Sequence, residues 1–211
     1  MTTDQEKQWA GGFGKAYTDR NPRTPETMDA LHIEQFGISR SELNREFLGS
    51  LDRSIRVLEV GANVGMQLEL LRRLGFTQLY GVELQFYAIQ QSRSATTGLR
   101  LVQGSGFALP FPDAAFDLVF TSGVLIHISP DDIGRMLDEI HRCARMFIWG
   151  WEYFAEHYTQ VNYRGETDLL WKTDFAKLYR DRFPNLDLLK ERRVKYLKND
   201  NVDSMFLLKK R

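Results

Sequence analysis

The sequence predicts an α/β fold in which a mostly parallel sheet is covered by helices on both faces. Three observations predict it. From Ile55 onward, short apolar runs typical of buried strands alternate with helical patterns. The first of these runs ends in a glycine-bearing turn that opens directly into a helix. Two further strands close the chain on either side of the turn-rich residues 198–201, so we expect them to pair antiparallel.

The length and composition fit one unit with a full hydrophobic core, since 43% of the 211 residues are apolar. We expect residues 1–50 to form an N-terminal helical cap and residues 51–211 to form the sheet-containing domain, as one structural unit. Lys plus Arg equals Asp plus Glu at 28 each, so the formal net charge is zero. That balance makes nucleic acid an unlikely partner, because a nucleic-acid surface normally carries a basic excess.

Cysteine use and hydropathy indicate a cytoplasmic protein. The one cysteine, Cys143, has no partner for an internal disulfide, which favours a reducing compartment. Residues 1–7 are polar, and no stretch reaches the length of a membrane span, so we expect no contact with a membrane. These features leave the oligomeric state open.

Each element is predicted from its local pattern. The expected strands are 55–60, 79–83, 99–102, 116–121, 146–151, about 186–196 and 204–209. The expected helices are 27–48, 66–74, 87–93, a helix capped by Ser129 that runs to about Cys143, and 173–183. Before them, Trp9, Phe13 and Tyr17 recur every four residues and would share one face of a helix.

The stretch Glu59-x-Gly61-x-Asn63-x-Gly65 joins the first strand to the next helix. A strand that turns into a helix at glycines leaves free backbone N–H groups at the helix N-terminus, which suits a nucleoside or phosphate. The acid Glu83 follows eighteen residues after Gly65, at the end of the second strand. A carboxylate at that edge can accept both hydroxyls of a ribose.

Together these stretches resemble the class I S-adenosylmethionine-dependent methyltransferases, whose first motif is usually acid-x-Gly-x-Gly-x-Gly. Residues 116–120, Phe-Asp-Leu-Val-Phe, resemble the fourth-strand motif of that class. The resemblance implies a Rossmann-like fold with a seven-stranded, mostly parallel sheet and one antiparallel strand at the C-terminus. It implies S-adenosylmethionine as cofactor and S-adenosylhomocysteine as product. Asn63 replaces the middle glycine of this motif, and asparagine tolerates a left-handed backbone. The replacement counts against an NAD site, because a glycine at that position lets the pyrophosphate of NAD approach the backbone.

The resemblance assigns a set of cofactor-binding residues. Ser105 stands where many class members have an aspartate for the adenine amino group, and its hydroxyl or the backbone can take over that role. Phe107 can pack on the adenine, Tyr17 can face the methionine arm, and Arg20 can pair with the cofactor carboxylate. The full set is Tyr17, Arg20, Glu59, Gly61, Asn63, Gly65, Glu83, Leu84, Ser105, Gly106, Phe107 and Thr121.

Catalytic candidates follow the fourth and fifth strands. His127 is the best candidate for a general base, because the pKa of an unperturbed histidine suits neutral pH; the alternative is a histidine that only supports its loop. Glu152 and Tyr153 end the fifth strand at the same mouth. Tyr163 and Arg164 are candidates for substrate binding, with Arg164 placed to hold an acidic group. No His, Cys and Asp spacing indicates a metal site.

A narrower resemblance covers most of the chain and concerns the substrate. The sequence is similar to the methylases associated with pseudaminic acid biosynthesis in residues 9–21, 58–66, 123–128 and 163–165. It implies methyl transfer to a small molecule such as a nonulosonic-acid-type sugar or its nucleotide-linked form. The alternatives are methylation of another small metabolite or of RNA, a non-catalytic cofactor-binding protein, and an NAD-dependent oxidoreductase.

Overall fold

A seven-stranded sheet forms the centre of the computed structural model, which describes residues 3–21, 24–95, 98–163, 165 and 167–211. The strand order is β3-β2-β1-β4-β5-β9-β8. Strands β1 to β5 run parallel, and β9 is antiparallel to both of its neighbours. The predicted fold class is therefore confirmed. The strands are β1 Arg56–Val60, β2 Gln78–Glu83, β3 Arg100–Gln103, β4 Phe116–Ser122, β5 Ala144–Tyr153, β8 Leu186–Lys195 and β9 Val202–Lys210, and a separate small pair joins β6 Thr159–Gln160 to β7 Trp171–Lys172.

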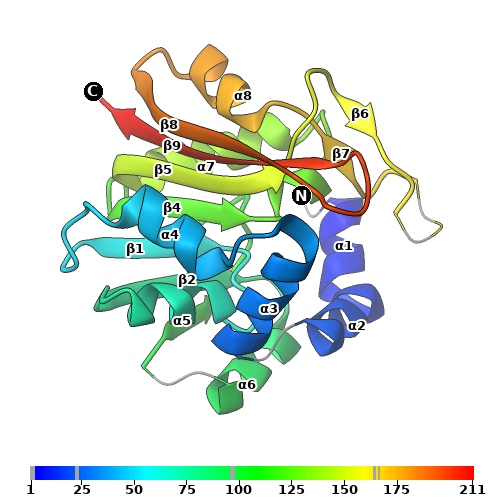
Figure 1. Ribbon diagram of the computed structural model, residues 1–211, viewed down its shortest axis with the longest axis horizontal. Helices are drawn as coiled ribbons and strands as arrows, with labels where there is room; N and C mark the ends of the chain where they lie inside the picture. The colour runs from blue at the N-terminus through cyan, green and yellow to red at the C-terminus, as the bar shows by residue number, and fades with distance from the viewer. Residues whose placement is uncertain (1–2, 22–23, 96–97, 164, 166) are drawn as a thin grey trace.

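Helices cover both faces of this sheet. Figure 1 shows α4 and α5 in front of the sheet and α7 behind it. The helices are α1 Asp4–Ala10, α2 Gly12–Arg20, α3 Pro25–Phe36, α4 Arg40–Leu48, α5 Met66–Arg73, α6 Phe86–Ala95, α7 Ile133–Cys143 and α8 Phe175–Arg182, with a short 3₁₀ turn, η1, at Leu125–His127. None of the helices in the described part of the chain is both long and apolar enough to cross a bilayer.

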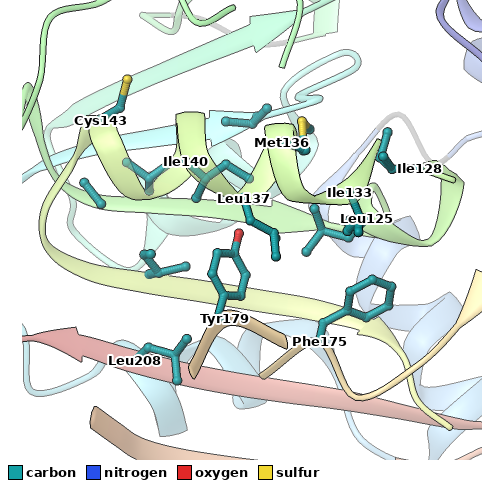
Figure 2. Close-up of a cluster of buried hydrophobic side chains, with 14 of the residues drawn as sticks. Leu125, Ile128, Ile133, Met136, Leu137, Ile140, Cys143, Phe175, Tyr179 and Leu208 are labelled. Carbon is teal, nitrogen blue, oxygen red and sulfur yellow. The ribbon is translucent and has the colours of Figure 1, made fainter. Parts of the chain in front are cut away.

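Each central strand is buried on both faces, as expected of a covered parallel sheet. In β4, Leu118 and Phe120 belong to the core under α4 and α5, whereas Val119 between them belongs to the core under α7 and α8. Figure 2 shows the second core, where Leu137 of α7 and Tyr179 of α8 meet over the sheet. These two cores hold the carboxyl ends of the strands in fixed positions.

Two predicted helix boundaries are wrong. The helix after η1 begins at Ile133, with Asp132 and not Ser129 as its N-cap, because residues 129–132 form a turn closed by a 3.1 Å hydrogen bond from the N–H of Asp132 to the Ser129 carbonyl. The helical pattern over 27–48 is two helices, since Gly37 adopts a left-handed φ of 74° and ends α3. Ser39 and Glu42 then form the capping box that starts α4.

The N-terminal helices α1 and α2 lie at the end of the sheet toward which the arrows of β4 and β5 point (Figure 1). The aromatic helix expected around Trp9 is interrupted at Gly11, which separates α1 from α2. The aromatic face still forms, because the Trp9 ring contacts the edges of Phe13 and Tyr17 at centroid distances of 5.0 and 5.1 Å. This face closes over the carboxyl ends of the strands.

Candidate functional site

A cavity of about 400 Å³ runs along the carboxyl ends of the parallel strands, beneath α1, α2 and α3. Its lining follows the strand order across the sheet. The segment after β3, the end of β2 and the loop after β1 line one half. The loop after β4, the end of β5 and the start of β9 line the other half. This volume is in the range of small-molecule sites, which lie at this edge in doubly wound sheets.

The loop after β1 is shaped by backbone conformations that few residues adopt. Gly61 has a φ of 76°, and a Cβ placed there would lie 2.6 Å from Cγ2 of Val124. Asn63 is left-handed with a φ of 48°, which is the property that lets asparagine stand in for a glycine. The N–H groups of Gly61 and Ala62 both donate to the carbonyl of Val82 on β2, at 2.8 and 3.0 Å. The loop is therefore tied to the neighbouring strand.

Glu83, at the end of β2, receives two backbone hydrogen bonds. Its carboxylate accepts from the N–H of Asn63 at 2.7 Å and from the N–H of Gln85 at 2.8 Å. Burial raises the pKa of Glu83, and these N–H donors partly oppose that rise. Each oxygen keeps lone pairs for further donors, so the group can still accept two hydroxyls from a ligand in the cavity.

Glu59 lies at the end of β1, 4% exposed, and also lines the cavity. Burial raises its pKa well above the usual value, against the attraction of Arg40. Its Oε2 has no hydrogen-bond partner among the described residues. A buried carboxyl oxygen without a donor is costly, so Glu59 can accept a hydrogen bond from a ligand in the cavity.

The segment after β3 closes the cavity at its far end, where Leu84, Ser105, Gly106 and Phe107 contribute to the lining. The Ser105 hydroxyl donates to the carboxylate of Glu6 on α1 and accepts from the N–H of Phe107 at 3.0 Å. The guanidinium group of Arg135 lies over the Phe107 ring, 5.0 Å from the ring centroid. Ser105 therefore links α1 to this end of the cavity.

The helices α1 and α2 are fastened over the cavity by polar contacts. Gln85 Nε2 donates to the carbonyls of Trp9 and Gly11 at 3.2 and 2.9 Å. Asn63 Nδ2 donates to Thr18 Oγ1 at 3.0 Å. Tyr17, one of the predicted cofactor-binding residues, lines the cavity. Both fastening residues belong to the loops after β1 and β2, so the cover and the cavity floor share their contacts.

His127 is held in η1 with one defined tautomer. Its Nδ1 lies 2.7 Å from the carbonyl oxygen of Leu169, and since a carbonyl only accepts, Nδ1 carries the proton. Nε2 is therefore the free acceptor of the ring. Burial lowers the pKa of His127 to about 4, against the Leu169 hydrogen bond, so the ring is neutral at neutral pH but is a weaker base than the unperturbed histidine that the sequence prediction assumed. The Trp9 ring lies over it at 4.5 Å, and His127 lines the cavity.

Glu152 supports the loop that carries His127. Its carboxylate accepts from the N–H groups of Val124 and Ile126 at 3.2 and 3.4 Å. Burial raises the pKa of Glu152 to about 7, and a hydrogen bond from Thr121 opposes this rise. Glu152 lines the cavity together with Tyr153 and Tyr163. The three sequence candidates therefore line the same cavity as His127.

Arg40, which the sequence analysis missed, is a buried cation beneath this mouth. It is 1% exposed, its Nε donates to Gln67 at 3.1 Å, and its Nη2 donates to Ser122 at 3.0 Å. Burial lowers its pKa to about 10, while Glu59, Asp203 and Glu152 raise it. The available signal was its spacing, because Arg40 shares a helix face with the apolar Leu43 and Phe47.

Four predicted site residues are not placed in the cavity lining. Gly65 caps α5 in a left-handed conformation and shapes the loop from outside the cavity. Arg20 is exposed, and its guanidinium group lies over the Tyr17 ring, 5.8 Å from the ring centroid. Thr121 is buried beneath the lining, where its side chain donates to Glu152. Arg164 falls outside the described residues.

The cavity wall has unmet hydrogen-bonding capacity. Five lining residues carry a buried polar atom without a hydrogen-bond partner in the described part of the chain: Trp9 Nε1, His32 Nδ1, Glu59 Oε2, Gln85 Oε1 and Asp203 Oδ1. Buried polar atoms are normally paired, so the wall is built for a polar ligand. No group of three or more His, Cys, Asp or Glu residues that could hold a metal occurs among the residues described.

Comparison with known proteins decides between the ligands that such an edge can hold. Residues 58–146 match the family model of a methyltransferase domain. The matched residues make up less than half of the chain and are similar to a methyltransferase domain. The protein is an enzyme, a methyltransferase that uses S-adenosylmethionine. The residues present fit that cofactor, since Glu83 offers a carboxylate to the ribose, and Trp9 and Glu59 offer an unpaired donor and acceptor within the same cavity.

Solved structures show that the enzyme has the class I methyltransferase fold. A S-adenosylmethionine-dependent methyltransferase from Leishmania major is 18% identical, with a TM-score of 0.72 over 98% of this chain and 87% of that one. A putative methyltransferase from Haloferax volcanii, solved with the Trm112 methyltransferase activator, is 16% identical, with a TM-score of 0.67 over 96% of both chains. The 1,6-didemethyltoxoflavin-N1-methyltransferase of Burkholderia thailandensis, solved with 1,6-didemethyltoxoflavin and S-adenosylhomocysteine, is 19% identical, with a TM-score of 0.64 over 81% of this chain and 76% of that one.

Proposed function

We propose that the enzyme methylates a small molecule that enters the cavity beside His127. The observation that carries this proposal is that one cavity joins Glu83 at the cofactor half to His127 and Glu152 at the other half. The aromatic residues Trp9, Tyr153 and Tyr163 line the mouth of that second half. Such walls favour a compact acceptor over a long nucleic-acid strand.

In this proposal the cofactor-binding residues are those that line the first half. Glu83 holds the ribose, Ser105, Gly106, Phe107 and Leu84 enclose the adenine, and Glu59 accepts from the methionine end. Gly61 and Asn63 shape the loop, while Trp9 and Tyr17 cover it. Arg20 and Thr121 support this half from outside the cavity. When bound, S-adenosylmethionine supplies a methyl group on a positively charged sulfur.

His127 is the proposed base. Its Nε2 carries the free lone pair, because Nδ1–H is committed to Leu169. Nε2 takes the proton that an acceptor hydroxyl or amine loses. Glu152 positions His127 by holding the N–H groups of Val124 and Ile126. The rings of Trp9 and Tyr163, at 4.5 and 5.4 Å from the His127 ring, keep water away from it.

The identity of the acceptor rests on the narrower resemblance. It favours a nonulosonic-acid-type sugar or its nucleotide-linked form, with Tyr163 at the mouth and Arg164 as the residue for a carboxylate. Other small metabolites are the alternative that the cavity equally admits. We place the enzyme in the cytoplasm, because its cysteine is a buried free thiol.

The test is methyl transfer from deuteromethyl-labelled S-adenosylmethionine into a small-molecule extract, followed by mass spectrometry. We expect the label in a small metabolite, and a labelled sugar or nucleotide sugar would support the narrower assignment. Label found only in added RNA would contradict the small-molecule proposal. Binding of S-adenosylhomocysteine without transfer to any acceptor would instead indicate a non-catalytic binding protein.

A further inference from the structure

The half of the cavity farthest from Glu83 contains a carboxyl group surrounded by aromatic rings. Asp203 is the second residue of β9 and pairs with Tyr153 at the end of β5, so it reaches the same edge as His127. Around it the cavity is lined by His32 and Phe36 of α3, Trp151 and Tyr153 of β5, and Tyr196 after β8. These residues come from three separate parts of the chain.

The rings form a continuous wall. Phe36 contacts Trp151 at a centroid distance of 5.3 Å and Tyr196 at 4.4 Å. Tyr153 lies 5.7 Å from Tyr196, and His32 lies 5.6 Å from Trp151. Aromatic faces attract cations more strongly than they attract neutral groups of the same shape.

Asp203 is held in this wall with an unmet acceptor. The residue is 4% exposed, and its Oδ1 has no hydrogen-bond partner within the described residues. Its Oδ2 accepts only a long hydrogen bond from the Tyr196 hydroxyl, at 3.4 Å. Burial raises the pKa of Asp203 to about 8, although Arg40 and Lys172 act to lower it. The ionised carboxylate would therefore gain from one more positive charge.

The cations already present do not fill this place. Arg40 lies against Trp151, 4.8 Å from the ring centroid, and donates to Gln67 and Ser122. Lys172 lies 5.0 Å from the Tyr153 centroid and donates to Asn201. Neither residue lines the cavity, and no Lys or Arg does so in the described part of the chain. The acids that line this half are Glu152 and Asp203.

We propose that Asp203 and the surrounding rings of Trp151, Tyr153 and Tyr196 form a subsite for a positively charged amine on the acceptor. This inference rests on the proposed function and adds a substrate class to it. The amine is the group that is recognised, so the subsite sets specificity independently of which atom is methylated.

The experiment uses the full chain saturated with S-adenosylhomocysteine, and three probes of nearly equal shape: benzylamine, benzyl alcohol and benzoate. Calorimetry and ligand-detected NMR compare the probes at about pH 8.5, above the pKa of Asp203. We expect benzylamine to bind at least about tenfold more tightly than benzyl alcohol, as an ion pair within an aromatic site predicts, and benzoate to bind least. Equal binding of amine and alcohol, preference for benzoate, or no binding of any probe would overturn the inference.

Variants locate the effect. Asp203→Asn keeps the shape of the side chain and removes its charge, so we expect the preference for the amine to disappear while S-adenosylhomocysteine binding stays within about twofold. Asp200→Asn, on an exposed residue of the same hairpin, is the matched control and should leave both unchanged. An unchanged amine preference in Asp203→Asn would also overturn the inference. If the wild-type protein did not bind S-adenosylhomocysteine at all, that result would instead contradict the proposed function.

Discussion

The backbone N–H of Asn63 donates a 2.7 Å hydrogen bond to the side-chain carboxylate of Glu83. This bond joins the loop after β1 to the end of β2. The acid that the sequence assigns to a ribose therefore also fixes the loop that faces the cofactor. Asn63 can present its N–H in this direction because it adopts a left-handed backbone, with a φ of 48°.

The first prediction concerns Glu83→Gln, which replaces a carboxylate oxygen with an amide donor. Hydrogen bonds to a charged group contribute about 1.5–3 kcal/mol, so the Kd for S-adenosylhomocysteine should rise about 10- to 100-fold. Calorimetric titration measures this change. Glu26→Gln, at an exposed acid of α3 that pairs with Arg73, serves as the control. Equal affinity of wild type and Glu83→Gln would rule out Glu83 as a ribose ligand.

The second prediction tests the glycine turn. Gly61→Ala combines a left-handed φ with a Cβ placed 2.6 Å from Val124, so we expect a loss of about 2–4 kcal/mol in the free energy of unfolding and weaker cofactor binding. Gly123→Ala has a similar φ of 66° but no neighbouring atom within 4 Å, and it should cost less. Adding Val124→Ala to Gly61→Ala should restore part of the loss. Urea unfolding of the four proteins measures these differences, and equal costs at Gly61 and Gly123 would disprove the contact.

The third prediction separates catalysis from binding at His127. His127→Gln removes the basic Nε2, so turnover of the labelled acceptor should fall by about 10²- to 10⁴-fold. The Kd for S-adenosylhomocysteine should change by less than about threefold, because the residue lies in the other half of the cavity. Since the pKa of His127 is lowered to about 4, turnover should show no acid limb from this group between pH 6 and 8. Wild-type turnover in His127→Gln would assign the histidine to support of its loop.

The fourth prediction concerns the pH dependence of stability. Burial lowers the pKa of His32 from 6.5 to about 3, so between these values the unfolded chain binds a proton that the folded protein does not. Stability must then fall as the pH drops from 6.5 toward 3, by up to about 1.4 kcal/mol per pH unit from this group. His32→Phe keeps a ring beside Phe36 and Trp151 and removes the titration.

Urea unfolding at several pH values between 4 and 7 provides the measurement. The difference in unfolding free energy between His32→Phe and wild type should grow in favour of the variant as the pH falls. His157→Asn, at an exposed histidine, should run parallel to wild type. Parallel curves for His32→Phe and wild type would show that His32 is not held neutral in the folded protein.

Much of the fold follows from local patterns in the sequence. The alternation of strands and helices predicts the sheet, and the turn at 198–201 predicts its antiparallel end. The cofactor half is also predictable, because Glu59, Gly61, Asn63 and Glu83 stand at fixed distances along one continuous segment. The helix boundaries near Gly37 and Ser129 are harder to predict, because each depends on which of two local hydrogen-bond patterns forms.

The other half of the cavity was only partly predictable, for a physical reason. Arg40, Trp151 and Asp203 are brought together by packing between distant parts of the chain, and their identities follow no shared spacing. Thr121 illustrates the opposite error, since it ends up beneath Glu152 and outside the lining. In both cases, the packing of the whole fold decides which side chains are buried and which line the cavity. Local sequence patterns do not predict that packing.

The position of Asp203 in β9 has a consequence for biosynthesis. The strand ends and loops that line the cofactor half, from Glu59 to Phe107, leave the ribosome as one uninterrupted stretch. Asp203 comes later in the chain and enters the sheet between β5 and β8, which are already synthesised. A nascent chain thus holds every strand next to the cofactor before its acceptor pocket exists, and that pocket is complete only once β9 has been made and has paired with β5 and β8.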